Sequence, residues 1–281
     1  MLLLKKVIKL KDFFKYLDGQ ISAHYARDIN PDPSEFKMHT HERCELYGFL
    51  GGKGIYKIEG TKYILQKGDI LIMKPAESHY IEVDKGYPYT RFVINFPVDI
   101  FEGIDKSGAL VSAYTQRENG QFNLYRSTDF KNGSYEFYFK NMFAPSENRR
   151  LQLISNLMPL LNEISAAFRE KRDESISESE EYKIVSYINR NLFKQITLDD
   201  ICREFFISKP QLCRSFKAAT GSTVWNYITA KRLVTAKNMI QSGQSPTKVF
   251  SECGFSDYSS FYRAYIKKHG VSPAQTHQSE R

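Results

Sequence analysis

The chain has 281 residues, a length typical of about two domains, and its 41% hydrophobic content is enough for two cores. Its formal net charge is +8, and the surplus is local. Residues 182–281 carry 15 Lys and Arg against 6 Asp and Glu, whereas residues 1–181 carry 25 against 26. Because phosphate backbones attract clustered cations, this composition indicates nucleic-acid binding by the last third of the chain. A Lys-rich solvated helical surface is the alternative.

Two features argue against a secreted or membrane-spanning protein. The apolar part of Met1–Lys6 is too short for a signal peptide or a membrane span. The four cysteines lack the spacing of a zinc site; they are Cys44, Cys202, Cys213 and Cys253. We therefore expect reduced thiols, a cytoplasmic location and no membrane partner.

Residues 1–105 have the pattern of a small antiparallel β-barrel. Strand-like segments at residues 54–59 and 62–65 flank a Gly60–Thr61 turn, and a further strand is expected at residues 70–73. Short strands at such close spacing are typical of a barrel.

Histidines and one glutamate recur within this barrel at a recognisable spacing. The pattern H-x-H-x3-E-x6-G is similar to the first motif of the cupins, and a Gly, Pro and His set approximates the second. The residues are His39, His41, Glu45 and Gly52, followed by Gly68, Pro75 and His79. The second motif departs from the cupin pattern because it lacks a glycine and is one residue short. Since alternate residues of a strand share a face, these side chains can converge on one site.

Three interpretations of these side chains stay open. They can line a pocket for a small molecule, they can be structural barrel residues, or three imidazoles and a carboxylate can hold a transition metal ion. Arg91, in the strand-like segment Tyr89–Phe92, is a further candidate contact for an anionic or hydroxylated ligand. Its alternative is an exposed strand arginine.

Residues 106–172 are expected to form a helical connector. Apolar residues recur there at steps of three and four, as on an amphipathic helix. The stripe comprises Leu151, Ile154, Met158, Leu161, Ser165 and Phe168, widened by Leu153, Leu157, Leu160 and Ile164. Such a wide stripe predicts a dimerisation element, with a helix packed only on its own barrel as the alternative. Pro159 predicts a kink, and the acidic segment 173–181 is expected to be the interdomain linker.

Residues 182–281 contain one helix-turn-helix pattern twice, 49 positions apart, with a long helix expected over residues 223–241 between them. The matched pairs are Phe206 and Phe255, Leu212 and Phe261, Arg214 and Arg263, Phe216 and Tyr265, and Gly221 and Gly270. The expected helix caps are Thr197 and Ser208 in the first copy, Ser245 and either Ser256 or Asp257 in the second, and glycines 221 and 270.

This region resembles the C-terminal domain of the AraC/XylS family of bacterial transcription regulators. The resemblance covers residues 182–281, and its most specific part runs from Ser245–Pro246 through residues 253–263 to Pro273. The chain departs from the family pattern at Tyr265–Ile266 and at Pro210. The resemblance implies a DNA-binding domain whose two second helices enter major grooves about 34 Å apart.

Arg214 and Arg263 occupy equivalent positions on these two helices and are the candidates for bidentate contact with guanine. A phosphate contact or a surface ion pair is the alternative for each. Further candidate DNA-contacting residues on the same faces are Gln211, Cys213, Lys217, Ser259, Tyr262 and Lys267. The expected core residues are Leu212, Phe216, Phe261 and Tyr265.

The expected fold class is α+β. It combines a cupin-like antiparallel barrel at 1–105, a helical connector and dimerisation element at 106–172, an acidic linker at 173–181 and an all-α domain at 182–281. Sugar-sensing members of the family use the same barrel as a metal-free pocket. We therefore favour a ligand pocket without a cofactor or metal ion, and its candidate residues are His39, His41, Glu45, His79 and Arg91.

The predicted function is a ligand-responsive, sequence-specific transcription regulator and not an enzyme. Its expected partners are double-stranded promoter DNA, a small-molecule effector for which a carbohydrate is one candidate, and a second copy of the chain, with RNA polymerase as a further candidate. The alternatives are a metal-dependent cupin enzyme fused to a DNA-binding domain and a ligand-independent DNA-binding protein whose barrel only dimerises.

Overall fold

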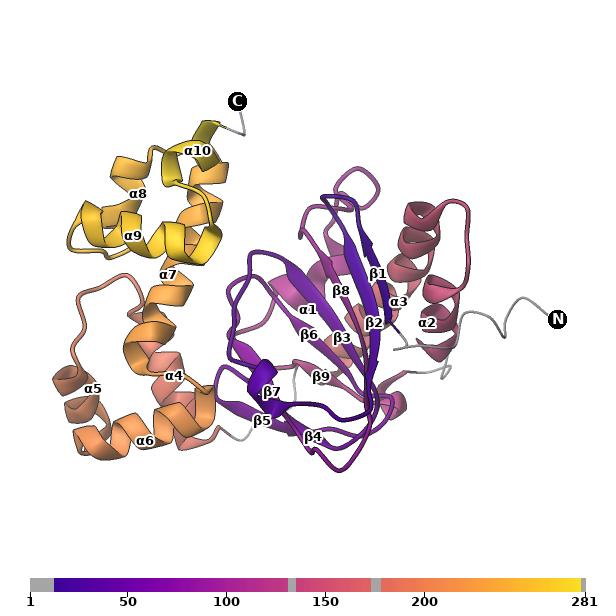
Figure 1. Ribbon diagram of the computed structural model, residues 1–281, viewed down its shortest axis with the longest axis horizontal. Coiled ribbons are helices and arrows are strands. Elements are labelled where there is room, and N and C mark those ends of the chain that lie inside the picture. The colour runs from indigo at the N-terminus through magenta and orange to yellow at the C-terminus, as the bar shows by residue number, and fades with distance from the viewer. Residues whose placement is uncertain (1–12, 131–134, 173–177, 279–281) are drawn as a thin grey trace.

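The computed structural model describes residues 13–130, 135–172 and 178–278. A β-barrel domain with helices on its outer side stands beside an all-helical domain (Figure 1). The predicted fold class, an antiparallel barrel followed by a helical domain, is confirmed. Residues 1–6 and 173–177, which entered the predictions of location and linker, lie outside the described residues. Within the described ranges, no helix is long and apolar enough to cross a bilayer.

Two antiparallel sheets form the barrel. The strands are β1 (Phe13–Leu17), β2 (Ser22–Asp28), β3 (Cys44–Gly51), β4 (Gly54–Ile58), β5 (Thr61–Ile64), β6 (Ile70–Met73), β7 (His79–Val83), β8 (Tyr89–Phe96) and β9 (Leu124–Tyr125). One sheet has the order β1-β2-β8-β3-β6-β9 and the other β5-β4-β7. The short strand β9 pairs with β6, so the sheet includes a segment of the stretch expected to be a helical connector.

The central strands β3 and β6 of the larger sheet are buried on both faces. In β3, Leu46 belongs to the core beneath the helices, whereas Tyr47 and Phe49 face the barrel interior. This alternation follows from the two-residue period of a strand. Gly48 is required on the helix side, because a Cβ atom there would lie 1.6 Å from the Phe92 ring.

The turn between β4 and β5 lies one residue earlier than predicted. Ile58 pairs with Thr61, so Glu59 and Gly60 form the two-residue loop. Both have positive φ, 50° and 85°, as a type I′ hairpin requires. The Glu59 side chain is nevertheless buried, at 1% exposure, because the helical domain covers it.

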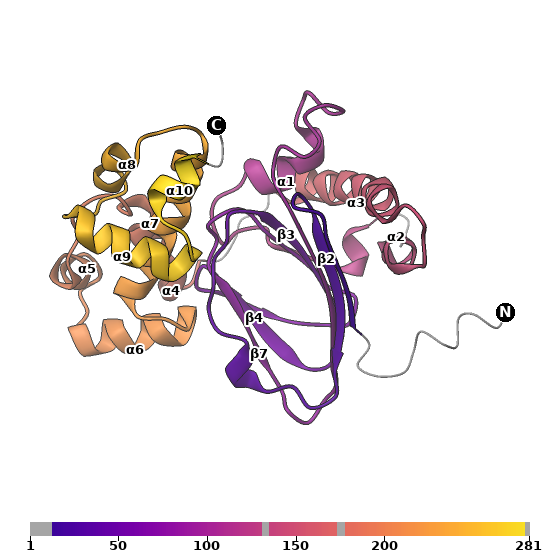
Figure 2. The same ribbon diagram turned by 45° about the horizontal axis from the view of Figure 1, so that its top comes forward.

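Helices α1 (Ser112–Thr115), α2 (Tyr135–Phe143) and α3 (Arg149–Lys171) follow the barrel. In both ribbon views, α2 and α3 lie on the side of the barrel away from the helical domain (Figures 1 and 2). Short 3-10 helices lie at Pro33–Glu35, Ala109–Val111 and Ser127–Asp129. The predicted apolar stripe on α3 is confirmed in its C-terminal half, where Leu161, Ser165 and Phe168 are buried, but not at Leu151, which is 61% exposed. The residues Leu153, Leu157, Leu160 and Ile164 are fully buried along the whole helix. The widening residues are thus the centre of the packed face, and α3 continues through Pro159.

The helical domain contains α4 (Glu180–Arg190), α5 (Leu198–Phe205), α6 (Lys209–Thr220), α7 (Val224–Gln241), α8 (Pro246–Glu252), α9 (Tyr258–His269) and α10 (Pro273–Gln278). Ser179 caps α4, so the end of the expected linker belongs to this helix. The predicted caps Thr197, Ser208 and Asp257 each accept a backbone N–H, and Gly221 and Gly270 close their helices with positive φ. Ser245 holds the cap position of α8, but its hydroxyl contacts Thr247 instead.

Each helix-turn-helix unit has its own core, as predicted. Leu212 and Phe216 are buried in the first core, and Phe261 and Tyr265 in the second. Helix α7 contributes to both cores and joins the two units. The repeat is imperfect at one position: Phe206, the cap of α5, is 95% exposed, whereas its counterpart Phe255 packs on the second core.

A buried carboxylate joins the two domains. Glu59 accepts hydrogen bonds from Lys231 Nζ at 2.8 Å, from Asn189 Nδ2 at 2.6 Å and from the Tyr227 hydroxyl. Lys231 is itself only 2% exposed. A buried charge is costly unless it is paired. Glu59 and Lys231 would each lose this partner if the two domains separated, so the pair stabilises the contact between the domains.

A second buried ion pair, between Arg117 and Glu77, lies in the barrel domain. The two side chains are 0% exposed, and Arg117 Nη1 and Nη2 each lie 2.6 Å from a Glu77 oxygen. The Glu77 carboxylate also accepts the Gly120 N–H and the Asn123 amide. This bidentate pair ties the loop after α1 to the turn before β7.

Arg117→Met should lower the free energy of unfolding of the barrel domain by about 3–5 kcal/mol, because Glu77 would keep a buried charge without its partner. Denaturant unfolding monitored by tyrosine fluorescence measures the change. The control is Arg150→Met. Arg150 pairs with Asp18 at the surface and is 42% exposed, so its loss should cost less than about 1 kcal/mol. Equal costs for the two variants would contradict this account of the pair.

Candidate functional site

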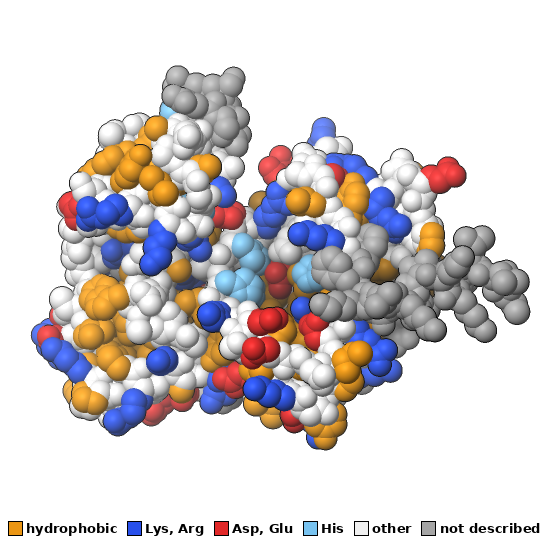
Figure 3. All heavy atoms as spheres, in the orientation of Figure 1, with side chains coloured by type: hydrophobic (Ala, Val, Ile, Leu, Met, Phe, Trp, Pro, Cys, Tyr) orange, Lys and Arg blue, Asp and Glu red, His pale blue; other side chains and the backbone are white. Residues whose placement is uncertain are grey.

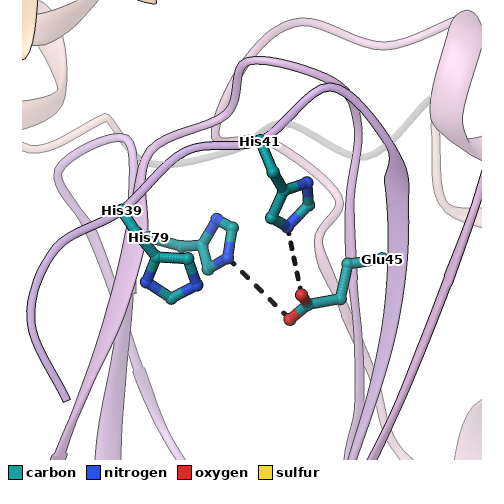
Figure 4. Close-up of side chains that lie close together, drawn as sticks. All are labelled: His39, His41, Glu45 and His79. Carbon is teal, nitrogen blue, oxygen red and sulfur yellow. Dashed lines mark hydrogen bonds and ion pairs between the residues drawn. The ribbon is translucent and has the colours of Figure 1, made fainter. Parts of the chain in front are cut away.

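The histidines and glutamate predicted from the sequence converge in the structure. His39 and His41 lie on the segment before β3, Glu45 on β3 and His79 at the start of β7, and all four point toward one another (Figure 4). One ligand atom from each residue lies within 4.8 Å of the others. His39 is exposed, His41 is half-buried, and Glu45 and His79 are buried. Backbone pairing brings two of these residues together, because His39 forms an antiparallel β-bridge with His79.

Main-chain carbonyls orient the three imidazoles, because each ring directs its Nδ1 at a backbone oxygen. Each Nδ1 lies 2.9–3.0 Å from a backbone oxygen: His39 from Lys37, His41 from Arg43 and His79 from Glu77. Each Nε2 consequently faces the centre of the cluster. There, His41 Nε2 lies 3.1 Å from Glu45 Oε2, whereas His79 Nε2 is buried without a hydrogen-bond partner.

The electrostatics of the cluster fix two of its protonation states. Burial opposes a charged Glu45, but the hydrogen bond from His41 and the electrostatic attraction of the surrounding imidazoles lower the pKa of its carboxyl to about 2. Burial and the neighbouring His39 lower the pKa of His79 to about 3. Burial also opposes a charged His41, yet Glu45 raises the pKa of His41 overall. At neutral pH the cluster therefore holds a carboxylate and a neutral imidazole at its buried end.

A cavity of about 320 Å³ opens beside the cluster into the barrel. Tyr47 and Tyr89 line it and share a hydrogen bond of 2.8 Å. Arg91 also lines the cavity; it donates to Asp28 at 2.5 Å and lies 4.4 Å from the centre of the Tyr89 ring. Polar groups that converge on an apolar cavity are the usual features of a small-molecule site.

Sequence reasoning missed much of this lining. His24, Tyr47, Tyr56, Tyr89 and Asn95 face the cavity from four strands. The spacing of tyrosines along a strand does not distinguish residues that line a pocket from residues of an ordinary core. Only the pairing of the strands shows which tyrosines face the cavity.

The predicted DNA-contacting side chains all lie on the surface of α6 and α9. Exposed residues are Gln211, Cys213, Arg214 and Lys217 on α6, and Ser259, Tyr262, Arg263 and Lys267 on α9. Leu212, Phe216, Phe261 and Tyr265 form the opposite, buried faces. The four cysteines, all among the described residues, are free thiols.

The candidate ligand site and the helical domain are adjacent. Figure 3 shows histidine side chains at the boundary between the two domains, beside acidic ones. Thr40 O accepts a hydrogen bond from Lys268 Nζ at 3.2 Å, and Glu42 Oε1 lies 3.3 Å from His269 Nδ1. In the first helix-turn-helix unit, Ala218 O near the end of α6 accepts a hydrogen bond from Lys57 Nζ at 2.8 Å. The barrel thus contacts the C-terminal ends of both α6 and α9.

A barrel with a polar internal site, joined to two helix-turn-helix units with exposed second helices, defines a DNA-binding regulator with a sensor domain. Two family models match the chain accordingly: an AraC-like ligand binding domain over residues 21–138 and a helix-turn-helix domain over residues 201–279. The chain belongs to the AraC family of transcription regulators.

The chain is similar to two relatives over nearly their whole length. The HTH-type transcriptional activator RhaR of Shigella flexneri serotype 5b (strain 8401) is 23% identical over 275 residues, which cover 95% of this chain and 94% of the relative. RhaR of Escherichia coli (strain K12) is 22% identical with the same coverage. Among solved structures, ToxT from Vibrio cholerae matches 91% of this chain and 97% of its own at a TM-score of 0.40 and 11% identity. The DNA-binding domain of AdpA in complex with a target DNA matches 35% of this chain and 90% of its own, with a TM-score of 0.34 and 21% identity.

Proposed function

We propose that this regulator changes its binding to promoter DNA, or its activation of transcription, when a small polar molecule occupies the cavity beside the His–Glu cluster. A carbohydrate fits the chemistry of the lining, because hydroxyl groups can bond to Tyr47, Tyr89, Arg91 and the imidazoles. The proposal assigns no catalytic step to the chain.

One observation supports the coupling more than any other: the segment of residues 39–45 serves both domains. His39, His41 and Glu45 point into the cluster, whereas Thr40 and Glu42 contact Lys268 and His269 at the end of α9. The side chains of His39, His41 and Glu45 therefore belong to the proposed ligand site, whereas the Thr40 carbonyl and the Glu42 side chain belong to the domain interface. A ligand that shifts this segment changes the support of the second recognition helix.

Glu42 provides the test of this coupling. Glu42→Ala should leave effector binding to the barrel unchanged but reduce the effect of the effector on DNA affinity, because the contact with His269 is lost. His41→Ala should abolish effector binding while leaving basal DNA binding nearly unchanged. Thermal shift with a panel of neutral monosaccharides and electrophoretic mobility shift report the two properties separately. A normal effector response in His41→Ala would rule out this site.

Arg214 and Arg263 are the residues that we propose to contact base edges, supported by their equivalent, exposed positions on α6 and α9. Arg263→Ala should cost about 1–3 kcal/mol at the specific operator and relax the preference at one base pair. Lys267→Ala, the control, should weaken all sequences alike because a lysine at a phosphate carries no base information. Competition binding with base-substituted operators distinguishes the two. Uniform weakening by Arg263→Ala would reassign Arg263 to a phosphate.

We infer that a second copy of the chain packs on the outer side of α2 and α3, which faces away from the helical domain (Figure 2). Leu151 on α3 and Phe137 on α2 are each 61% exposed there. Leu151→Glu should shift the protein from dimer to monomer in analytical ultracentrifugation and weaken binding to a two-site operator, because the second copy supplies avidity. Leu17→Glu is the control, since Leu17 is equally exposed, at 62%, on the edge strand β1. An unchanged sedimentation of Leu151→Glu would place the dimer interface elsewhere.

A further inference from the structure

The hydrogen bonds of the three imidazoles determine what the cluster can bind. A backbone carbonyl only accepts hydrogen bonds, so the carbonyls of Lys37, Arg43 and Glu77 place a proton on Nδ1 of His39, His41 and His79. In the neutral imidazole, Nε2 then carries a lone pair. Nε2 of His39 and of His79 can thereby each present a lone pair to the cluster, and Nε2 of His41 can do so when its hydrogen bond to Glu45 Oε2 is exchanged for an ion. The same outer-shell arrangement orients histidines around protein-bound metal ions.

The buried end of the cluster has two acceptors facing each other. His79 Nε2 is buried, has no hydrogen-bond partner and lies 3.8 Å from Glu45 Oε1. A neutral imidazole with its proton on Nδ1 cannot donate through Nε2, and a carboxylate cannot donate at all. Leaving such buried groups unsatisfied is costly, whereas a cation between them would satisfy both.

We propose that His39, His41 and His79, through Nε2, and Glu45, through its carboxylate, bind one divalent transition metal ion at the edge of the cavity. A donor set of three imidazoles and one carboxylate favours ions such as Zn²⁺, Fe²⁺, Co²⁺ or Ni²⁺ over Mg²⁺ and Ca²⁺. This geometry favours a metal ion over the metal-free lining that we expected from the sequence. The regulatory consequence rests on the proposed function, because the same segment contacts α9.

The spacing of the four ligand atoms fits such an ion after a small contraction. Bonds of about 2.0–2.2 Å place the donor atoms of a metal centre about 3 to 4.4 Å apart. The present atoms lie within 4.8 Å of one another. His39 can supply the movement, because it is exposed and lies outside the regular strands. The remaining coordination positions would face the cavity, where the effector is proposed to lie.

Metal binding to the chelator-treated full chain tests the site directly. Equilibrium dialysis with Zn²⁺ and Co²⁺ should give one ion per chain, and Co²⁺ should produce visible absorption bands of a site with nitrogen and oxygen ligands. His39→Gln should weaken the affinity roughly 100-fold or more, since a direct ligand matters at least as much as an outer-shell partner. His39 is exposed, so this variant keeps the fold.

The matched control is His277→Gln. His277 lies on α10 and is not one of the four clustered residues, so its loss should leave the stoichiometry and affinity unchanged. Binding below one ion per chain in the wild type, or equal weakening by both variants, would overturn the metal site.

The regulatory consequence has its own readout. Adding Zn²⁺ to the metal-free protein should change operator affinity by about fivefold or more, the usual lower range of allosteric coupling. In Glu42→Ala, the ion should bind as in the wild type but change DNA affinity less than about twofold. A DNA response to Zn²⁺ that persists in Glu42→Ala would overturn this route.

Failure of the metal site and failure of the proposed function give different results. If no ion binds but monosaccharides still alter operator affinity, the metal proposal is wrong and the sensor function stands. If the ion binds stoichiometrically but neither ion nor monosaccharide alters operator affinity, the metal site stands and the sensor function is wrong.

Discussion

The buried pairing of Glu59 with Lys231 is the interaction on which the arrangement of the two domains depends. Glu59 sits in a tight turn at the tip of the smaller sheet, and the helical domain supplies Lys231, Tyr227 and Asn189 around its carboxylate. Neither charge has water as an alternative partner, so each holds the other in place. With this contact formed, the C-terminal ends of α6 and α9 both rest against the barrel.

This docking places the proposed ligand cavity next to the helical domain. The proposed DNA-contacting faces of α6 and α9 are exposed, whereas the ends of these helices contact the barrel, in part through residues that line the cavity. Tyr80, for example, lines the cavity and bonds to Ala218 at the end of α6. A shift in the barrel can therefore alter the relative placement of the two recognition helices, which operator spacing constrains.

The His–Glu cluster shows how backbone geometry specifies side-chain chemistry. The same carbonyl contact recurs at His39, His41 and His79, although they lie on different segments. It orients each ring and selects its tautomer, so the cluster is organised before any ligand arrives. Such preorganisation reduces the free energy needed to order the site on binding.

Local signals in the sequence determined the helical domain and the existence of the cluster. Capping residues such as Thr197 and Asp257 and glycines at helix ends depend only on neighbours a few positions away, and a 49-residue repeat can be read directly by comparing the sequence with itself. Both helix-turn-helix units could therefore be predicted. The H-x-H spacing similarly identified His39 and His41, because alternation along an extended chain is local.

Only the tertiary structure decided the features that need contacts between distant segments. The exposure of Leu151 on α3, the tyrosine lining of the cavity and the burial of Glu59 and Arg117 depend on what packs against each residue, and sequence periodicity carries no such information. The same holds for Thr40 and Glu42, which have no distinguishing pattern and became interface residues because α9 lies beside them. The sequence therefore determined the helix-turn-helix units and the His–Glu cluster, whereas long-range packing decided the rest of the cavity lining and how the barrel meets the helical domain.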